Sequence, residues 1–433
     1  MKIKIPVFLF YFLVSMNLAA QFSLELLSPL PEPMSNGAIE YGEVNDFGYV
    51  FIWGSLDSTL MSPGIHKRGY KLDLQTNVWS ELPELPDSAG KLALSASRIG
   101  DIIYIIGGYH VLSNGSEISS NKVHRFSVSQ NLFLEDASTI PIAIDDQIQF
   151  TYHDSLIYVV SGWSNTGNVT DVQVYNPDSD SWTAASPVPA SGGFRVFGSS
   201  GCVIGDTIYY FGGALSNGIN FPASNRLCKG IINPENPLDI SWETIIPDAS
   251  IKRYRSACIV AEAFPHWVGG SSISYNYNGI AYNGSGPVSP EESILKWDFT
   301  EFETLELSGL PMDIRAVARI NDSTWVIAGG LLSGPEVSNQ VWKLTYSGIS
   351  GINKIESHLN LFPVPTETRL KIDSDKNIIS WNVLDSGMNE VVAGINNFNQ
   401  PLEIDTEFLN PGLYWVKLLH PKGEITFRKF VKN

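Results

Sequence analysis

Six polar residues recur along the chain at intervals of about fifty to sixty residues and could together form one ligand site. They are Asn36, Lys91, Asp146, Arg195, Arg255 and Arg315. The planar guanidinium of arginine binds a carboxylate or phosphate through two parallel hydrogen bonds, so this set suits an anionic ligand. The same arginines could instead form ion pairs with Asp145, Asp146 or Asp313, and both interpretations stay open.

A long loop at 271–293 offers a second kind of binding chemistry. It carries Tyr275, Tyr277 and Tyr282 among Asn, Ser and Gly, a composition that supplies contact area at low entropic cost. Tyrosine rings also suit stacking on sugars. Tyr109 and Trp163 directly follow glycines and could join the same rim. The alternative is a variable surface loop.

Signatures of known enzyme classes are absent from the sequence. It contains no G-x-S-x-G elbow, no H-E-x-x-H pair and no phosphate-binding loop. The seven histidines are scattered and no C-x-x-C occurs, so neither a metal site nor a cofactor is expected. Cys202, Cys228 and Cys258 are interpreted as buried free thiols, although Cys202 and Cys258 could form a disulfide if their strands are neighbours.

A strand that ends in glycine recurs six times and must position the candidate residues. Its copies cover 49–55, 102–108, 156–162, 207–213, 264–270 and 324–330. Most copies continue with two further strands joined by a turn, as where Leu72 precedes Trp79 and Tyr175 precedes Trp182. Asp, Asn, Ser and Pro between these pairs favour hairpin turns. Repeats of about fifty residues with four short strands predict an all-β chain.

This pattern resembles the kelch repeat, and the resemblance implies a six-bladed β-propeller over 21–348. It is weakest in the fourth and fifth copies. In a propeller, the loops between blades and those between second and third strands share one face, which would gather the candidate residues around a channel mouth. The sixth copy lacks a closing strand, so residues 22–31 are expected to supply it and latch the ring.

After a linker at 349–357, residues 358–433 form a different, strand-rich block. Its segments resemble the type IX secretion C-terminal sorting domain (type A) of certain Gram-negative bacteria, with Val364 where that family usually has Asn. The resemblance implies a small immunoglobulin-like β-sandwich recognised by an outer-membrane translocon; an accessory module is the alternative. The residues expected to carry the sorting signal are Phe362, Pro363, Pro365, Gly387, Pro411, Gly412, Tyr414 and Lys429.

Residues 1–20 have the layout of a secretory signal peptide, with Lys2 and Lys4 before an apolar run and small residues before Gln21. No other run approaches the roughly 18 apolar residues of a membrane helix, so the mature chain is expected to have no transmembrane segment. The formal net charge of −17 argues against nucleic-acid binding. The product is expected to be secreted or attached to the outer-membrane surface.

These features favour a binding protein over an enzyme. The predicted function is recognition of a glycan or an extracellular protein through one propeller face. The alternative is an exported carbohydrate-active enzyme that resembles the kelch-type sialic acid mutarotases, in which Glu40 or Asp146 could transfer protons.

Overall fold

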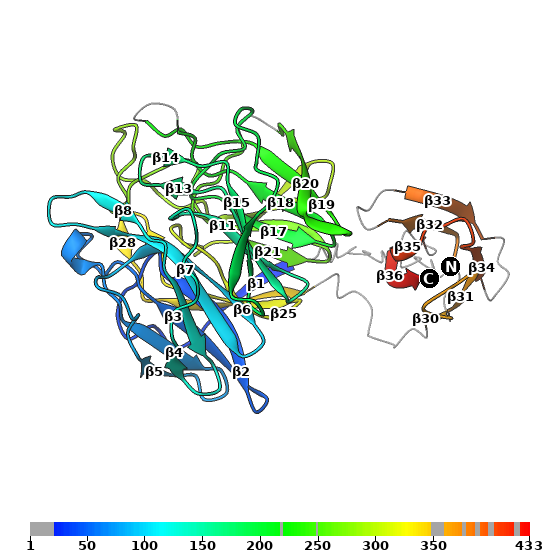
Figure 1. Cartoon of the computed structure of the whole chain (residues 1–433), viewed down its shortest axis with the longest axis horizontal. Helices are drawn as coiled ribbons and strands as arrows, with labels where there is room; N and C mark the ends of the chain where they lie inside the picture. Colours follow the sequence, from blue (N-terminus) through cyan, green and yellow to red (C-terminus); the bar gives the residue numbers. More distant parts are fainter. Residues whose placement is uncertain are drawn as a thin grey trace, which may run out of the picture.

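The computed structural model describes residues 21–216, 220–247, 250–347, 359–374, 378–385, 390–396, 402–419 and 425–433. Its described residues form strands and one 3₁₀ turn, η1 (Ser62–Gly64), which confirms the predicted all-β class. Figure 1 shows most of the strands in one large body and the C-terminal strands in a second, smaller body. The large body contains six sheets of at least four antiparallel strands, here called blades 1 to 6.

The first three blades follow the chain without interruption. Blade 1 contains β2 (Ala38–Val44), β3 (Phe47–Trp53), β4 (Gly69–Asp73) and β5 (Val78–Leu82). Blade 2 contains β6 (Leu92–Ile99), β7 (Ile102–Val111), β9 (Val123–Ser127) and β10 (Leu132–Phe133), with β8 (Glu117–Ser119) paired to β7. Blade 3 contains β11 (Ile148–Tyr152), β12 (Leu156–Val160), β15 (Val172–Asn176) and β16 (Ser181–Ala184). The hairpin of β13 (Trp163–Ser164) and β14 (Gly167–Asn168) extends from blade 3.

The last three blades complete the circle. Blade 4 contains β17 (Ser200–Ile204), β18 (Thr207–Phe211), β19 (Leu227–Asn233) and β20 (Asn236–Ile245). Blade 5 contains β21 (Ala257–Ala261), β22 (Phe264–Val268), β23 (Ser293–Trp297) and β24 (Phe302–Glu306). Blade 6 contains β25 (Ala318–Asn321), β26 (Thr324–Ala328), β29 (Val341–Ser347) and β1 (Gln21–Leu26), beside the hairpin of β27 (Leu331–Leu332) and β28 (Glu336–Val337).

The outer strand of blade 6 comes from the opposite end of the chain. β1 pairs antiparallel with β29, and Leu24 lies opposite Leu344 as Trp79 lies opposite Leu72 in blade 1. Leu24 therefore occupies the place of the closing-strand tryptophans. The strand is bound into the core because Phe22 is 5% exposed and its ring lies 4.8 Å from that of Tyr346.

The tryptophans of the closing strands also join neighbouring blades. The indole Nε1 of Trp182 donates to the carbonyl of Ser138, which follows blade 2, at 2.8 Å. Trp79 donates to the carbonyl of Ser28, directly after β1, at the same distance. The stretched fourth copy keeps this role, because Trp242 donates to Ser186 after blade 3. Its extra length is taken up by a bulge and a ten-residue strand.

Steric contact with the next blade explains why glycine recurs at the end of the second strand. Gly212 follows β18 with φ +77°, and a Cβ there would lie 2.0 Å from the carbonyl oxygen of Arg253. Its backbone must therefore pass directly against the loop that enters the next blade, which only glycine permits at this conformation.

The smaller body consists of two sheets that face one core. One sheet contains β30 (Leu359–Phe362), β31 (Arg369–Ser374) and β34 (Leu402–Asp405). The other contains β33 (Glu390–Ile395), β32 (Ser380–Leu384), β35 (Gly412–Leu419) and β36 (Ile425–Lys432). Buried residues from both sheets, including Ile372 and Val416, form a common cluster, as in a β-sandwich.

The predicted sorting residues occupy different parts of this sandwich. Phe362 is the exposed last residue of β30, and Pro363 and Pro365 follow it in an exposed stretch, while the half-buried Tyr414 stacks on Phe430. Pro411 and Gly412 stand exposed at the start of β35, and Lys429 pairs with Trp415 in the ladder. Gly387 lies outside the described residues.

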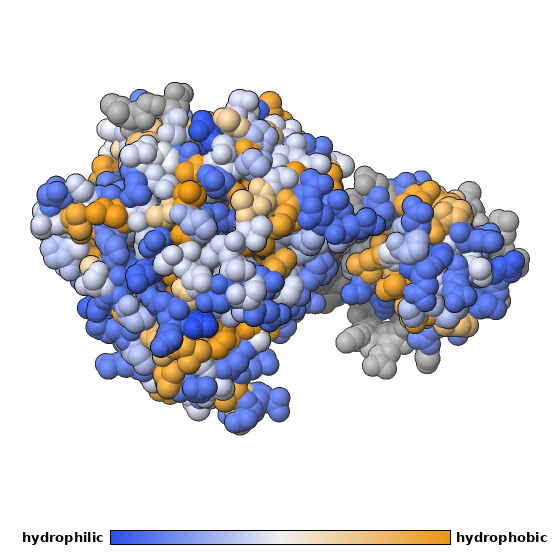
Figure 2. All heavy atoms as spheres, viewed as in Figure 1, coloured by the Kyte–Doolittle hydropathy of each residue, from blue (hydrophilic) through white to orange (hydrophobic). Residues whose placement is uncertain are grey.

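Two further sequence expectations concern thiols and membranes. Cys202, Cys228 and Cys258 are free thiols, so the disulfide left open between Cys202 and Cys258 is not formed. Across the described part of the chain, no helix has the length and hydropathy needed to cross a membrane. Figure 2 shows apolar side chains in small groups between polar ones on the face in view.

Candidate functional site

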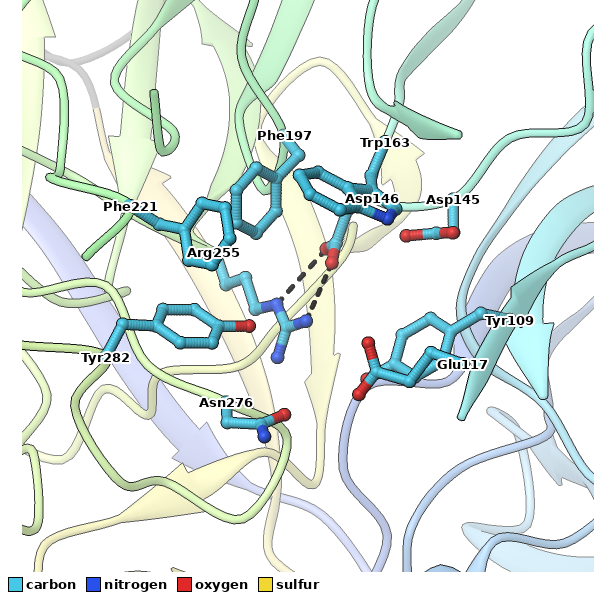
Figure 3. A pocket seen from close by; sticks show the side chains of 10 residues that line it. All are labelled: Tyr109, Glu117, Asp145, Asp146, Trp163, Phe197, Phe221, Arg255, Asn276 and Tyr282. Carbon is cyan, nitrogen blue, oxygen red and sulfur yellow. Dashed lines mark hydrogen bonds and ion pairs between the residues drawn. The ribbon is translucent and has the colours of Figure 1, made fainter. Parts of the chain in front are cut away.

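A pocket of about 100 Å³ opens on the propeller face that carries the loops between blades. It is called the mouth pocket, and Figure 3 shows its side chains. Blades 2 to 5 supply them, and they are Tyr109, Glu117, Asp145, Asp146, Trp163, Phe197, Phe221, Arg255, Asn276 and Tyr282. The pocket thus combines five aromatic rings, three carboxyl groups, one guanidinium and one amide.

A closed circle of backbone hydrogen bonds lies at the entry of the innermost strands. Each blade contributes one residue with a left-handed backbone, and its N–H donates to the carbonyl of the equivalent residue in the preceding blade. Blade 6 is the exception, because Ile314 donates there in place of Asp313. The six counterparts are Asn36, Ala93, Asp146, Gly198, Arg255 and Asp313. This circle fixes the side chains of its polar members beside the mouth.

A buried ion network fills the space inside the circle. Arg255 donates to both oxygens of Asp146, at 3.1 and 2.7 Å, and to Asp313 at 2.9 Å. Arg315 donates to Asp146 at 3.0 Å and to the carbonyl of Gln147 at 2.7 Å. Burying such charges is tolerable only when they are paired in this way. Figure 3 shows the Arg255 guanidinium turned toward Asp146, and the pairing leaves it little capacity for a ligand.

The electrostatics of the network follow from burial and pairing. Burial by itself lowers the pKa of Arg255, but the charge of Asp146 and its other partners raise that pKa well above its ordinary value. Burial raises the pKa of Asp313, and Arg255 opposes the increase. Arg255 is consequently a permanent cation held between two carboxyl groups.

Asp145 differs from its neighbour because no cation pairs with it among the described residues. Its side chain is 3% exposed, and Ser119 donates a hydrogen bond to one of its oxygens at 2.6 Å. Burial raises the pKa of Asp145 well above its usual range, and the charge of Asp146 raises it further. A carboxyl group of this kind can donate a hydrogen bond to a ligand as well as accept one.

The long loop at 271–293 lies across the mouth of the propeller channel. Tyr275 is fully buried, and its ring lies 5.7 Å from the Arg255 guanidinium, with Tyr254 on another side at 5.2 Å. Tyr277 packs into the cluster around Tyr109 of blade 2. The loop therefore covers the centre of the channel and leaves the pocket open toward blades 2 to 4.

The structure brings together part of the set expected from the sequence. Tyr109, Asp146, Trp163, Arg255 and Tyr282 line the mouth pocket. Tyr275, Arg315 and Asn36 lie in or beside the buried network, and neither the Nδ2 nor the Oδ1 atom of Asn36 meets a hydrogen-bond partner among the described residues.

Lys91 and Arg195 do not reach this pocket, contrary to expectation. Lys91 is 1% exposed and forms a 2.6 Å ion pair with Asp87, beside His124. Arg195 is exposed and lines a second pocket between blades 3 and 4. The reason is register: the residues that occupy the circle in blades 2 and 4 are Ala93 and Gly198, two and three positions further along.

Glu40, named from the sequence as a proton-transfer candidate, lies away from the pocket. It is on the innermost strand β2, half-buried, and the charges of Arg98 and Arg319 from neighbouring innermost strands act on it. Burial raises the pKa of Glu40 to about 7, and its backbone and arginine contacts moderate the increase.

Sequence reasoning missed half of the pocket's residues, namely Glu117, Asp145, Phe197, Phe221 and Asn276. Glu117 is in β8, a strand that the repeat pattern does not contain. Phe221 lies in the loop after the glycine pair of the fourth copy, where its aromatic character was the available signal. The others adjoin residues that were singled out.

Comparisons with known proteins agree with this architecture. A model of the kelch motif matches residues 150–189, and a model of the secretion system C-terminal sorting domain matches 360–433. The protein combines kelch repeats with a secretion sorting domain. The solved structure titled "Structure of YjhT" superposes with a TM-score of 0.59 over 75% of this chain and 100% of that one, at 17% identity, and this likeness concerns the fold.

Curated relatives match the propeller in part. Kelch-like protein 36 of Bos taurus is 25% identical over 203 residues, which are 47% of this chain and 30% of that protein. Kelch-like protein terF of Aspergillus terreus is 24% identical over 186 residues, or 40% of this chain and 38% of that protein. The chain thus spans about a third of the length of these relatives.

Proposed function

We propose that this protein is an exported binding protein and that its mouth pocket recognises a glycan. The observation that supports this most is the opposition of aromatic rings to carboxyl groups. In Figure 3 Trp163, Phe197 and Phe221 lie on one side, and Asp145 and Glu117 lie on another. A sugar ring presents a C–H face that suits an aromatic surface, and hydroxyls that donate strongly to carboxylates.

The state of the arginines favours a neutral sugar at this pocket over an anionic one. Arg255 is occupied by Asp146 and Asp313, whereas Asp145 and Glu117 add two carboxyl groups that pair with no cation among the described residues. A carboxylate ligand would meet these groups without a free cation. The arrangement therefore gives little support to a sugar-acid mutarotase, because the arginine that lines the mouth pocket is already paired.

A protein ligand is the other partner class expected from the sequence. A stable protein interface buries roughly 800 Å² on each partner, and its energy concentrates in apolar anchors. The mouth pocket encloses about 100 Å³, and half of its lining residues carry carboxyl, guanidinium or amide groups. Its size suits one sugar unit better than the anchor of a large interface.

Export through type IX secretion is the second half of the proposal. The match of a sorting-domain model to residues 360–433 supports it. Deletion of 354–433 should leave the propeller in the periplasm, as fractionation and surface proteolysis of cells would reveal. Unchanged delivery to the surface or medium would contradict this part of the proposal without affecting glycan binding.

A glycan array tests the binding half. The full chain should bind a restricted set of neutral glycans, and Trp163→Ala should abolish the signal. Glu117→Gln, at an exposed position that is easily tolerated, should weaken binding about 10-fold by loss of a charge-assisted hydrogen bond. The matched control is Phe47→Ala, which removes an exposed aromatic ring on the opposite face. Equal binding by Trp163→Ala and Phe47→Ala would refute a glycan site at the mouth.

One observation supports a catalytic second candidate. Asp145 forms no ion pair with any described residue, has a raised pKa, and lies in a pocket of suitable chemistry for a sugar. Such groups act as general acids when a proton must be delivered to a leaving or ring oxygen. Turnover of any glycan bound on the array, lost in Asp145→Asn while binding persists, would establish this candidate over simple binding.

A further inference from the structure

A second pocket lies beside the mouth pocket, between blades 3 and 4. It measures about 200 Å³, and its lining residues are Asn168, Ala190, Gly193, Arg195, Leu215 and Ser216. This volume is below the range of about 300 to 1,000 Å³ that is typical of sites for drug-sized ligands, so it suits a single ring. It is called the blade 3–4 pocket.

Arg195 gives this pocket a cation that the ion network does not use. Its side chain is exposed, and no carboxylate among the described residues pairs with it. This differs from Arg255 and Arg315, which are buried in ion pairs. A guanidinium in this state can bind two oxygens of a carboxylate or a sulfate through two hydrogen bonds at little desolvation cost.

Asn168 gives the same pocket a fixed acceptor. Its side chain is 7% exposed, and its Nδ2 donates to the carbonyls of Arg195, at 3.1 Å, and Ala214, at 3.0 Å. Both donors of the amide group are thereby used, which sets the orientation of the side chain. Its Oδ1 accepts no hydrogen bond from any described residue. A buried acceptor of this kind favours a ligand that brings an O–H or N–H group.

The two pockets share a wall. Trp163 of the mouth pocket and Asn168 of the blade 3–4 pocket lie opposite each other in the hairpin of β13 and β14. Phe197, also in the mouth pocket, exchanges backbone hydrogen bonds with Ala214, whose carbonyl also accepts from Asn168. Adjacent units of one chain-like ligand could therefore reach both pockets.

We infer that the blade 3–4 pocket is a subsite for an acidic sugar unit, which Arg195 binds through its anion and Asn168 through a ring hydroxyl. Leu215 and Ala190 supply apolar surface for the C–H groups of the ring. The inference rests on glycan binding at the mouth pocket, and it adds that the preferred glycan carries a negative charge next to its neutral unit. Both carboxylate and sulfate have the required anion chemistry.

Three oligosaccharides of equal length test this by calorimetric titration of the full chain. One is a neutral hexose oligomer, one carries a single hexuronic acid, and one carries a single sulfate. Wild-type protein should bind one or both charged oligomers about 10-fold more tightly than the neutral one, consistent with one charge-assisted contact. That preference should decline as salt is raised.

Variants separate this inference from the proposal on which it rests. Arg195→Gln should remove the preference and leave the affinity for the neutral oligomer within about 2-fold, since this side chain is exposed and forms no ion pair with a described residue. The control, Arg125→Gln in blade 2, removes a half-buried arginine, whose Nε donates to the carbonyl of Glu135. Asn168→Asp places a negative charge at the buried acceptor, so it should lower the affinity for the charged oligomers below that of Arg195→Gln.

Each outcome has a definite meaning. A preference for the hexuronic acid or for the sulfate supports the subsite and names its anion. Equal affinity for all three oligomers, or equal effects of Arg195→Gln and Arg125→Gln, overturns the subsite while glycan binding at the mouth stands. If Arg195→Gln loses the preference while Trp163→Ala binds normally, the subsite is supported and glycan binding at the mouth pocket is refuted. Absence of binding by every oligomer overturns both.

Discussion

Closure of the propeller depends on one aromatic side chain near the start of the chain. Phe22 is 5% exposed and packs on Tyr346 and Trp325 of blade 6 and on His266 of blade 5, with ring centroids 4.8, 6.4 and 5.4 Å apart. Phe22→Ala removes these contacts and leaves a cavity between the two blades. Truncation of a buried phenylalanine costs about 3–5 kcal/mol, which lowers the melting temperature of a large domain by roughly 6–10 °C.

Two measurements on the intact chain test this reasoning. Thermal unfolding should show the lowered melting temperature, and hydrogen exchange should accelerate in β1 and β29 before it does in other blades. Leu26→Ala is the matched control, because this residue is in the same strand but 57% exposed, and it should change stability by less than about 0.5 kcal/mol. Similar effects of the two variants, or unchanged exchange in β29 of Phe22→Ala, would refute the idea that β1 latches the ring through its buried face.

Three further perturbations address the channel and the repeat. Asp146→Asn should cost about 3–5 kcal/mol in denaturant unfolding, because it leaves Arg255 and Arg315 buried with incomplete pairing. Glu40→Gln should stabilise the protein by about 3 kcal/mol at pH 8 and by about 1 kcal/mol at pH 5, since a folded-state pKa of about 7 makes ionisation destabilising as pH rises from 4.5 through 7. Gly212→Ala should cost more than about 2 kcal/mol because its Cβ would overlap a carbonyl oxygen.

Matched variants make these outcomes decisive. Asp322→Asn removes an exposed carboxylate paired with Arg319 and should change stability by less than about 1 kcal/mol. Gly100→Ala is at φ +59° with open space around the Cβ, so it should cost only about 1 kcal/mol. Glu81→Gln removes an exposed carboxylate on β5 and should change stability by less than about 0.5 kcal/mol. Equality of any variant with its control would contradict the physical cause assigned to it.

The architecture was accessible from the sequence because each blade repeats the same steric demands. The glycine after the second strand, as at Gly212, and the closing-strand tryptophans, as at Trp79, are required by contacts between neighbouring blades. Such requirements recur at a fixed spacing and are visible without a structure. Even the missing closing strand was inferable, because a sheet edge left open would be unfavourable.

The site was less accessible because its members belong to different blades and loops of unequal length. Counting from the repeat selected Lys91 and Arg195, whereas Ala93 and Gly198 occupy the equivalent positions. Small residues leave no chemical signal in a sequence, so the error of two or three positions was not detectable. Asp145 could not be separated from its neighbour because its burial by Ser119 and the mouth residues, without an ion pair to any described side chain, arises only in the folded protein.

The pairing of Gln21 with Ser347 places the end of β29 at one face of the propeller, and this determines which face an attached protein would turn outward. The mouth is built from loops that precede β29, so the final residue of that strand lies toward the opposite face. Any tether that continues from Ser347 therefore departs from the side away from the ligand pockets. A cut after Ser347 would leave all six sheets whole, while a cut a few residues earlier would begin to release the latch. We expect an anchored form and a released form of the propeller to present the same accessible mouth.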